Sequence, residues 1–117
     1  HQDRKAQAKP DHLALYDAVC DFAFSQGDEV QRKELKFYTA FKSIKSFVSV
    51  LLWSPVRDPH IKIFLKLQPN EIELEDGFSH DVSNKGHWGV GDVEVIIRNQ
   101  ADLEKAKALI VKSYERG

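Results

Sequence analysis

Three extended segments, joined by connections of only a few residues, place the tightest limit on how this chain can fold. Residues 36–42, 47–53 and 60–67 are rich in aromatic and β-branched side chains, and the first and third alternate along the chain with period two. The connections, Ser43–Lys45 and Ser54–Pro59, are too short for the crossover that parallel strands require. The three segments therefore predict an antiparallel meander.

Segments of helical period lie on either side of this meander. The first predicts a helix over residues 12–25, with Asp11 as its N-cap and Gly27 as its stop, and the second predicts a helix that starts after the cap residue Asn99. The apolar stripe of the first helix is formed by Leu13, Tyr16, Val19, Cys20 and Ala23, and that of the second by Leu103, Ala106, Ile110 and Tyr114. Each stripe needs a sheet face to cover.

Residues 68–91 read as a long, mostly irregular segment, and Asp92–Arg98 as a fourth strand. The predicted class is α+β: an antiparallel four-stranded, or slightly larger, sheet with flanking N- and C-terminal helices, in the order α-β-β-β-loop-β-α. Residues 1–10 are expected to be a linker or tag remnant, and residues 11–117 a single domain.

Composition limits the classes of protein to which the chain can belong. Of its 117 residues 42% are hydrophobic, enough for a core, but no apolar run is long enough to cross a bilayer. The first ten residues are polar throughout and do not resemble a signal peptide. Cys20 is the only cysteine, which fits a reducing compartment. We expect a cytoplasmic domain without a membrane partner.

The segment from Gly77 to Asp92 contains the densest cluster of potentially reactive side chains. A metal site would use His80, Asp81, His87 and Asp92, but their spacing matches no zinc or manganese site. An acid–base pair would join His87 to Asp81 or Asp92. The favoured interpretation is a structural loop in which Trp88 is buried, with no catalytic residue, metal or cofactor. Its candidate ligand or partner contacts are His80, Asp81, His87, Trp88 and Asp92.

Basic residues interleaved with aromatic ones between residues 32 and 66 suggest a second kind of site. Lysines can bind phosphates while exposed aromatic rings stack on bases, so nucleic acid is a candidate partner. The candidate contacts are Lys36, Lys42, Lys45, Lys62 and Lys66. The alternative is that these lysines pair across the sheet with the acidic residues of the stretch 70–94.

Several stretches of the chain resemble the C-terminal domain of a bacterial and archaeal family labelled "predicted transport protein". They are residues 33–42, the strand Ile63–Leu67, residues 77–95 with the pattern G-H-W-G-x-G-D, and the helix from Asp102 to Glu115. The resemblance covers about residues 11–115. One departure is Val90, where the family pattern leads us to expect threonine.

This resemblance implies an accessory role. In the family, the domain often follows a domain similar to PD-(D/E)XK nucleases, whose catalytic residues would precede residue 1. We therefore expect a non-catalytic accessory domain that binds nucleic acid, a partner domain or another copy of itself. The alternatives are a small-molecule sensor with a pocket under the Gly77–Asp92 loop and a stand-alone hydrolase or metalloenzyme. The sequence leaves the oligomeric state open.

Overall fold

The computed structural model describes residues 9–43, 46–53, 58–83 and 91–116. In chain order its elements are helix α2 (Pro10–Phe24), strands β1 (Gln31–Glu34), β2 (Thr39–Lys42), β3 (Ser46–Trp53) and β4 (His60–Leu65), the 3-10 turn η1 (Pro69–Glu71), strands β5 (Ser79–Asp81) and β6 (Val93–Ile97), and helix α3 (Gln100–Arg116). The predicted α+β class is confirmed.

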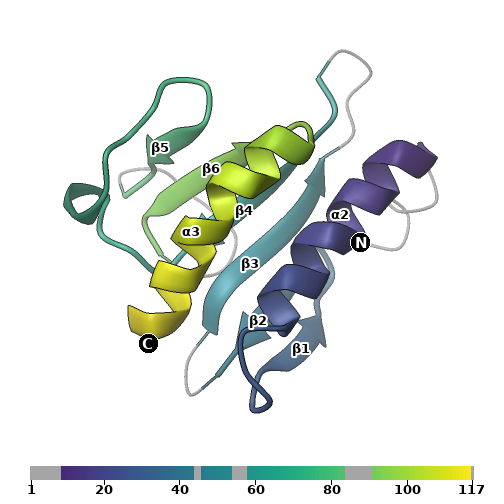
Figure 1. Ribbon diagram of the computed structural model, residues 1–117, viewed down its shortest axis with the longest axis horizontal. Helices are drawn as coiled ribbons and strands as arrows, with labels where there is room; N and C mark the ends of the chain where they lie inside the picture. The colour runs from purple at the N-terminus through teal and green to yellow at the C-terminus, as the bar shows by residue number, and fades with distance from the viewer. Residues whose placement is uncertain (1–8, 44–45, 54–57, 84–90, 117) are drawn as a thin grey trace.

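One open antiparallel sheet organises the described residues. Its six strands lie in the order β1-β2-β3-β4-β6-β5, so β1 and β5 are its two edges (Figure 1). The predicted meander is present in β2, β3 and β4. The predicted count of four strands is too low because the two edge strands are short and give little signal. All four residues of β1 are polar and exposed, and β5 has only three residues.

The first predicted strand also begins too early. A backbone hydrogen bond of 2.9 Å from the amide of Leu35 to the carbonyl of Tyr38 closes a hairpin between β1 and β2. Lys36 and Phe37 form the tip of that hairpin, and β2 begins only at Thr39. The alternation that starts at Lys36 therefore extends beyond the paired segment.

Both helices cover the same face of the sheet and lie side by side across it (Figure 1). α2 starts at Pro10 after Lys9, so the prediction of Asp11 as the N-cap is wrong; Asp11 lies in the first turn. The cap predicted for the second helix is confirmed, because the Asn99 side-chain oxygen accepts a hydrogen bond of 2.8 Å from the amide of Asp102. No helix within the described ranges is long and apolar enough to span a membrane.

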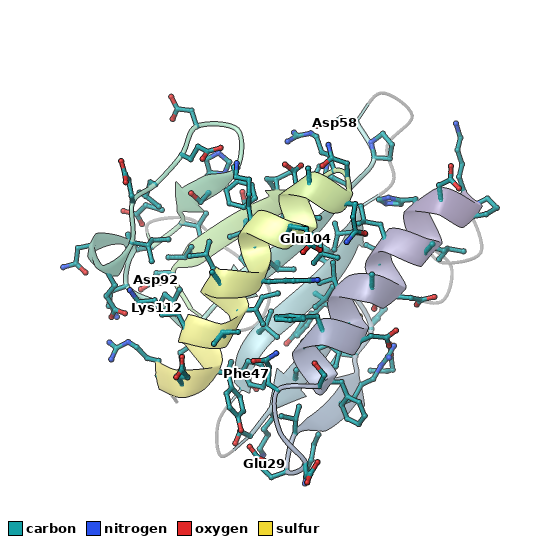
Figure 2. The ribbon with its side chains drawn as sticks, in the orientation of Figure 1. Glu29, Phe47, Asp58, Asp92, Glu104 and Lys112 are labelled. Atoms are coloured by element: carbon teal, nitrogen blue, oxygen red, sulfur yellow. The ribbon has the colours of Figure 1, made fainter. Side chains whose placement is uncertain are left out.

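The core lies between the helices and the sheet. It contains the stripes predicted for both helices together with the alternate residues of β2, β3, β4 and β6, and Cys20 is buried within it. Phe47, which is labelled in Figure 2, points toward the helix side of the sheet. Its ring forms a T-shaped contact with that of Tyr114, with ring centroids 5.1 Å apart. On the opposite face of the sheet Phe64 is only 3% exposed.

Gly91, the last glycine of the G-H-W-G-x-G-D pattern, lies in the segment that leads into β6, and its surroundings explain why a glycine is needed there. Its φ is 82°, in the region that favours glycine, and a Cβ there would lie 1.7 Å from the carbonyl oxygen of Leu65. The chain therefore passes so close to the end of β4 that no side chain fits at this position.

Candidate functional site

A groove lies on the sheet face opposite the helices, over β1, β2 and β3. Its volume is about 430 Å³, and it is lined by Lys33, Leu35, Tyr38, Ala40, Lys42, Ser46 and Ser49. We call it the basic groove. Among the described residues, its lining holds two lysines and one tyrosine but no carboxylate.

Strand register explains why this face is hollow over β2 and β3. Ala40 of β2 pairs with Ser49 of β3, so two small side chains lie side by side between bulkier neighbours. Because side chains on one face of a sheet stand next to their cross-strand partners, small partners leave a depression. The same cross-strand row runs over all six strands and consists of Lys33, Ala40, Ser49, Phe64, Glu94 and His80.

The two lysines of the groove differ from the ion-paired lysines of β4 and α3 in their lack of ionic partners. Lys33 and Lys42 are exposed and form no ion pair within the described residues. Lys62, in contrast, lies 3.7 Å from Glu94, and on α3 Lys105 and Lys107 pair with Glu75 and Glu104. The groove therefore carries two lysine charges that no described carboxylate neutralises.

A polar chain on the helix side holds the edge of the groove in place. The hydroxyl of Tyr16 on α2 is hydrogen-bonded to that of Thr39, and the Thr39 hydroxyl donates a 3.0 Å bond to the Glu34 carboxylate. Arg32 donates two bonds, of 3.0 and 2.8 Å, to the other oxygen of Glu34. Burial raises the pKa of Tyr16, so its proton stays in place. Because Arg32 and Glu34 point toward the helices, Lys33 between them points into the groove.

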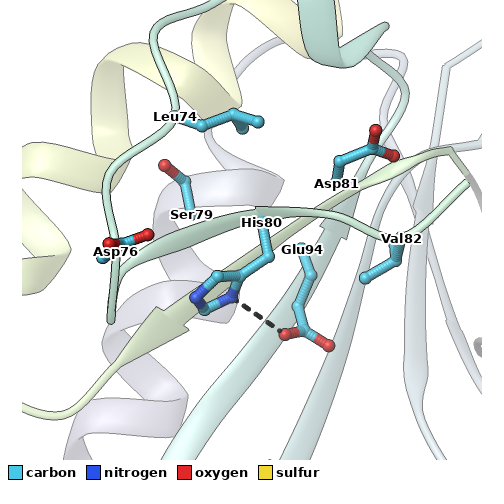
Figure 3. Close-up of a pocket in the computed structure, with 7 residues that line it drawn as sticks. All are labelled: Leu74, Asp76, Ser79, His80, Asp81, Val82 and Glu94. Atoms are coloured by element: carbon cyan, nitrogen blue, oxygen red, sulfur yellow. Dashed lines mark hydrogen bonds and ion pairs between the residues drawn. The ribbon is translucent and has the colours of Figure 1, made fainter.

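A second cavity, of about 460 Å³, lies at the opposite edge of the sheet, and we call it the edge pocket. Its lining residues are Leu74, Asp76, Ser79, His80, Asp81, Val82 and Glu94 (Figure 3). Nδ1 of His80 lies 3.2 Å from a carboxylate oxygen of Glu94, whose other oxygen faces Lys62. In the pocket the His80 imidazole and the Glu94 carboxylate therefore lie next to each other.

The sequence-predicted residues of the Gly77–Asp92 segment separate in the structure. His80 and Asp81 are neighbours on a strand, so their side chains point to opposite sides of the sheet. The Asp81 carboxylate caps the following turn by accepting bonds from the amide and the hydroxyl of Ser83. The Asp92 carbonyl accepts the amide of Val82. His87 and Trp88 lie outside the described residues.

Within the described residues no group of three potential metal ligands converges. The partner that the sequence reasoning missed is Glu94, which lies on β6 and pairs with His80 across the sheet. The available signal was the alternation of the fourth predicted strand, which puts Glu94 on the same face as Asp92 and Ile96. The pairing with His80 could not be predicted because the short strand β5 was not recognised.

The predicted nucleic-acid contacts also lie in different places. Of the five lysines, Lys42 lines the basic groove, Lys36 lies 5.3 Å from the Phe37 ring at the hairpin tip, and Lys62 is paired with Glu94. Lys66 lines a small cavity of about 190 Å³ with Gly91 and Arg116. Lys45 lies outside the described residues. Lys33, which the sequence reasoning did not select, is brought to the groove by β1.

A third polar cluster joins the start of β4 to the end of β6. The Arg98 guanidinium donates bonds of 2.8 and 3.0 Å to the Asp58 carboxylate and a further bond to the carbonyl of Gly77. The hydrogen bond from Arg98 lowers the pKa of Asp58. The Nδ1 atom of His60 lies 2.8 Å from the Asp58 carbonyl oxygen, and its buried Nε2 has no partner in the described part of the chain. Burial lowers the pKa of His60, and this effect is larger than the opposing effect of the nearby Asp58, which raises it.

Comparison with known proteins places the whole chain in one group. The family model described as "Domain of unknown function (DUF5655)" matches residues 2–117. An uncharacterized protein from Haemophilus influenzae is 27% identical over 119 residues, an alignment that covers 95% of this chain and 38% of that protein. The chain thus spans well under half the length of this relative. No solved structure matches the chain.

Proposed function

The chain belongs to the DUF5655 family, and we propose that it is a non-catalytic accessory domain that binds nucleic acid through the basic groove. The observation that carries this proposal is the pair of lysines at the groove, Lys33 and Lys42, which have no carboxylate partner in the described part of the chain. The described residues that line the groove include no carboxylate, which leaves the charge of the two lysines available to a ligand.

Phosphate binding follows from this charge distribution. Lysines that neutralise phosphates release condensed counterions, and this gain gives sequence-independent affinity, with dissociation constants of about 10⁻⁴–10⁻⁶ M at physiological salt. The net charge of −1 does not oppose local binding, because exposed charges farther apart than about 8–10 Å are largely screened at such salt concentrations. The groove supplies few contacts, so the affinity of the isolated domain lies at the weak end.

Weak binding suits a domain that acts beside another one. The relative from Haemophilus influenzae is much longer than this chain, and the resemblance noted above implies a nuclease-like domain upstream in such proteins. A weak site tethered to a second binding site raises the overall affinity through effective concentration. We propose that the domain holds nucleic acid near such a catalytic domain, in a protein that acts in the cytoplasm.

The test is a fluorescence anisotropy titration of a short labelled DNA with the purified chain at several salt concentrations. We expect saturable binding that weakens with salt, and a Lys33→Gln, Lys42→Gln double variant that lowers the slope of log affinity against log salt by about 2. A Lys105→Gln, Lys107→Gln variant, which removes the same charge from α3, is the matched control and should bind like the parent. Absence of binding at low salt would refute the proposal.

The edge pocket favours a second candidate function, that of a small-molecule sensor. Its lining of Asp76, Asp81, Glu94 and His80 beside the apolar Leu74 and Val82 suits a ligand that carries an amine. The test is thermal unfolding with and without spermidine or arginine. Stabilisation that is lost in Glu94→Gln would support this function, and an unchanged melting temperature with both ligands would count against it.

A further inference from the structure

We propose that the basic groove takes a single-stranded nucleic acid and that Tyr38 stacks on one of its bases. The inference rests on the proposed function and adds the form of nucleic acid that the groove selects. Three features carry it: the recessed floor, the aromatic wall, and the placement of the lysines at an open edge.

The floor of the groove is too recessed to match the outside of a duplex. Ala40 and Ser49 form it, and they lie below the side chains of Lys33 and Tyr38 that line the same cavity. A volume of about 430 Å³ can accept part of one nucleotide. Bases in a duplex are stacked and paired inside, so they cannot enter such a recess, whereas the bases of a single strand can be turned outward.

The aromatic wall is fixed in place by the hairpin. The bond from the amide of Leu35 to the carbonyl of Tyr38 closes the turn between β1 and β2, and both side chains line the groove. Tyr38 is half-buried and is absent from the hydrophobic core. A second ring, that of Phe37, is 36% exposed at the hairpin tip. Rings at the surface can stack on bases of any sequence.

The lysines are spaced to contact phosphates on either side of a stacked base. Lys33 pairs with Ala40, two residues from Lys42, so the two lysines are diagonal neighbours with backbones about 7–8 Å apart. The carboxylate of Glu34 lies on the other face, where it accepts the Thr39 hydroxyl, and so does not repel a phosphate in the groove. Because β1 is an edge strand of the sheet, a nucleic-acid strand can leave the groove on that side without meeting another of the described strands.

The experiment compares two labelled probes of equal length, an oligothymidylate of about ten nucleotides and a DNA duplex, in anisotropy titrations at one salt concentration. We expect the single strand to bind more tightly. Tyr38→Ala should weaken single-strand binding by about 5- to 150-fold with little effect on the duplex, and Tyr38→Phe should bind like the parent. Tyr38→Leu keeps an apolar side chain without a ring, and it should show the loss even if the alanine variant is poorly folded.

The possible outcomes separate this inference from the proposed function. Equal binding of both probes, with no loss in the leucine and alanine variants but a loss in Lys33→Gln, Lys42→Gln, would overturn the stacking inference and leave the proposed function in place. Binding that does not respond to the lysine variants would overturn both. A competition experiment adds a third outcome. If polyglutamate displaces the labelled oligothymidylate as effectively as unlabelled oligothymidylate does, the inference is overturned in favour of an acidic protein partner.

Discussion

At the scale of single residues, two glycines with left-handed backbone differ in what surrounds them. Gly77 and Gly91 have φ values of 79° and 82°, but only Gly91 lies against another strand. A side chain at Gly77 would meet nothing within 4 Å, whereas one at Gly91 would collide with the backbone of Leu65 and Lys66. A substitution at Gly77 therefore tests backbone strain alone, whereas one at Gly91 tests backbone strain together with steric collision.

This difference predicts unequal effects of the same substitution. Gly77→Ala should lower the free energy of unfolding by about 1–2 kcal/mol, the cost of a left-handed conformation for alanine. Gly91→Ala should lower it by more, because the adjoining backbone must also move. Urea unfolding of both variants measures the two losses. Equal losses would show that the segment at Gly91 moves away from β4 at little cost.

His60 makes a prediction about pH. Its folded pKa lies below the ordinary value of 6.5 because of burial, so the unfolded chain takes up a proton first as the pH falls. Its contribution to stability is therefore complete above about pH 6.5 and is lost as the pH falls toward the folded pKa, with a slope of at most about 1.4 kcal/mol per pH unit. Urea unfolding measured from about pH 5 to about pH 8, on both sides of the ordinary histidine pKa, should show this slope. The slope should be smaller in His60→Gln, and an identical slope in both proteins would exclude His60 as its source.

At the scale of elements, Ser113 links α3 to the ends of two strands. Its buried hydroxyl donates a 2.5 Å bond to the carbonyl of Phe47 in β3 and accepts a 2.8 Å bond from the amide of Lys66, just after β4. One side chain therefore fixes the helix over the line where the two strands meet. Serine in a helix more often faces solvent, so this role could not be predicted from the sequence pattern.

Removing this hydroxyl should have a measurable but limited effect. Ser113→Ala should lower the free energy of unfolding by about 1 kcal/mol, since the amide of Lys66 keeps a weaker bond of 3.3 Å to the Phe47 carbonyl. Ser83→Ala, which removes an exposed hydroxyl in a turn, serves as the control and should change it by less than about 0.5 kcal/mol. Chemical denaturation of both variants decides whether the buried link matters.

The elements predicted from sequence are those whose apolar pattern is strong. Helix α3 and strand β4 follow their stripes closely, and the Glu104–Lys107 pair on α3 forms with a separation of 2.8 Å. β1 and β5 were missed because an edge strand can be polar on both faces and owes its place to a single neighbour. The basic groove depends on β1, and the His80–Glu94 contact depends on β5, so neither site could be assembled from the sequence.

At the scale of the whole molecule, the sheet has an unbalanced distribution of charge. Lys33 and Lys42 lie toward the β1 edge, while Glu94, Asp76 and Asp81 gather at the β5 edge. The net charge of −1 conceals this arrangement. A surface with separate positive and negative regions can bind a polyanion although the protein as a whole is slightly acidic.

Chromatography on phosphocellulose at pH 7 tests this arrangement. We expect the chain to be retained at low salt despite its net charge, because the basic groove contacts the phosphate groups of the matrix. Lys33→Glu with Lys42→Glu should abolish retention. Lys105→Glu with Lys107→Glu changes the net charge equally and should leave the elution salt unchanged. Equal effects of the two pairs would mean that net charge, not the groove, governs binding.

The strand order has a consequence for the time at which the domain forms during synthesis. β6 is the last strand made, yet it lies between β4 and β5 and pairs with both. Until residues 93–97 have emerged from the ribosome, β4 is paired only with β3, and its other edge has no partner strand. Ile61, Ile63 and Leu65, which are fully buried in the finished domain, lie along that open edge. The sheet is therefore complete only after β6 has been made, and a chaperone that acts on this domain before then would meet it at the open side of β4.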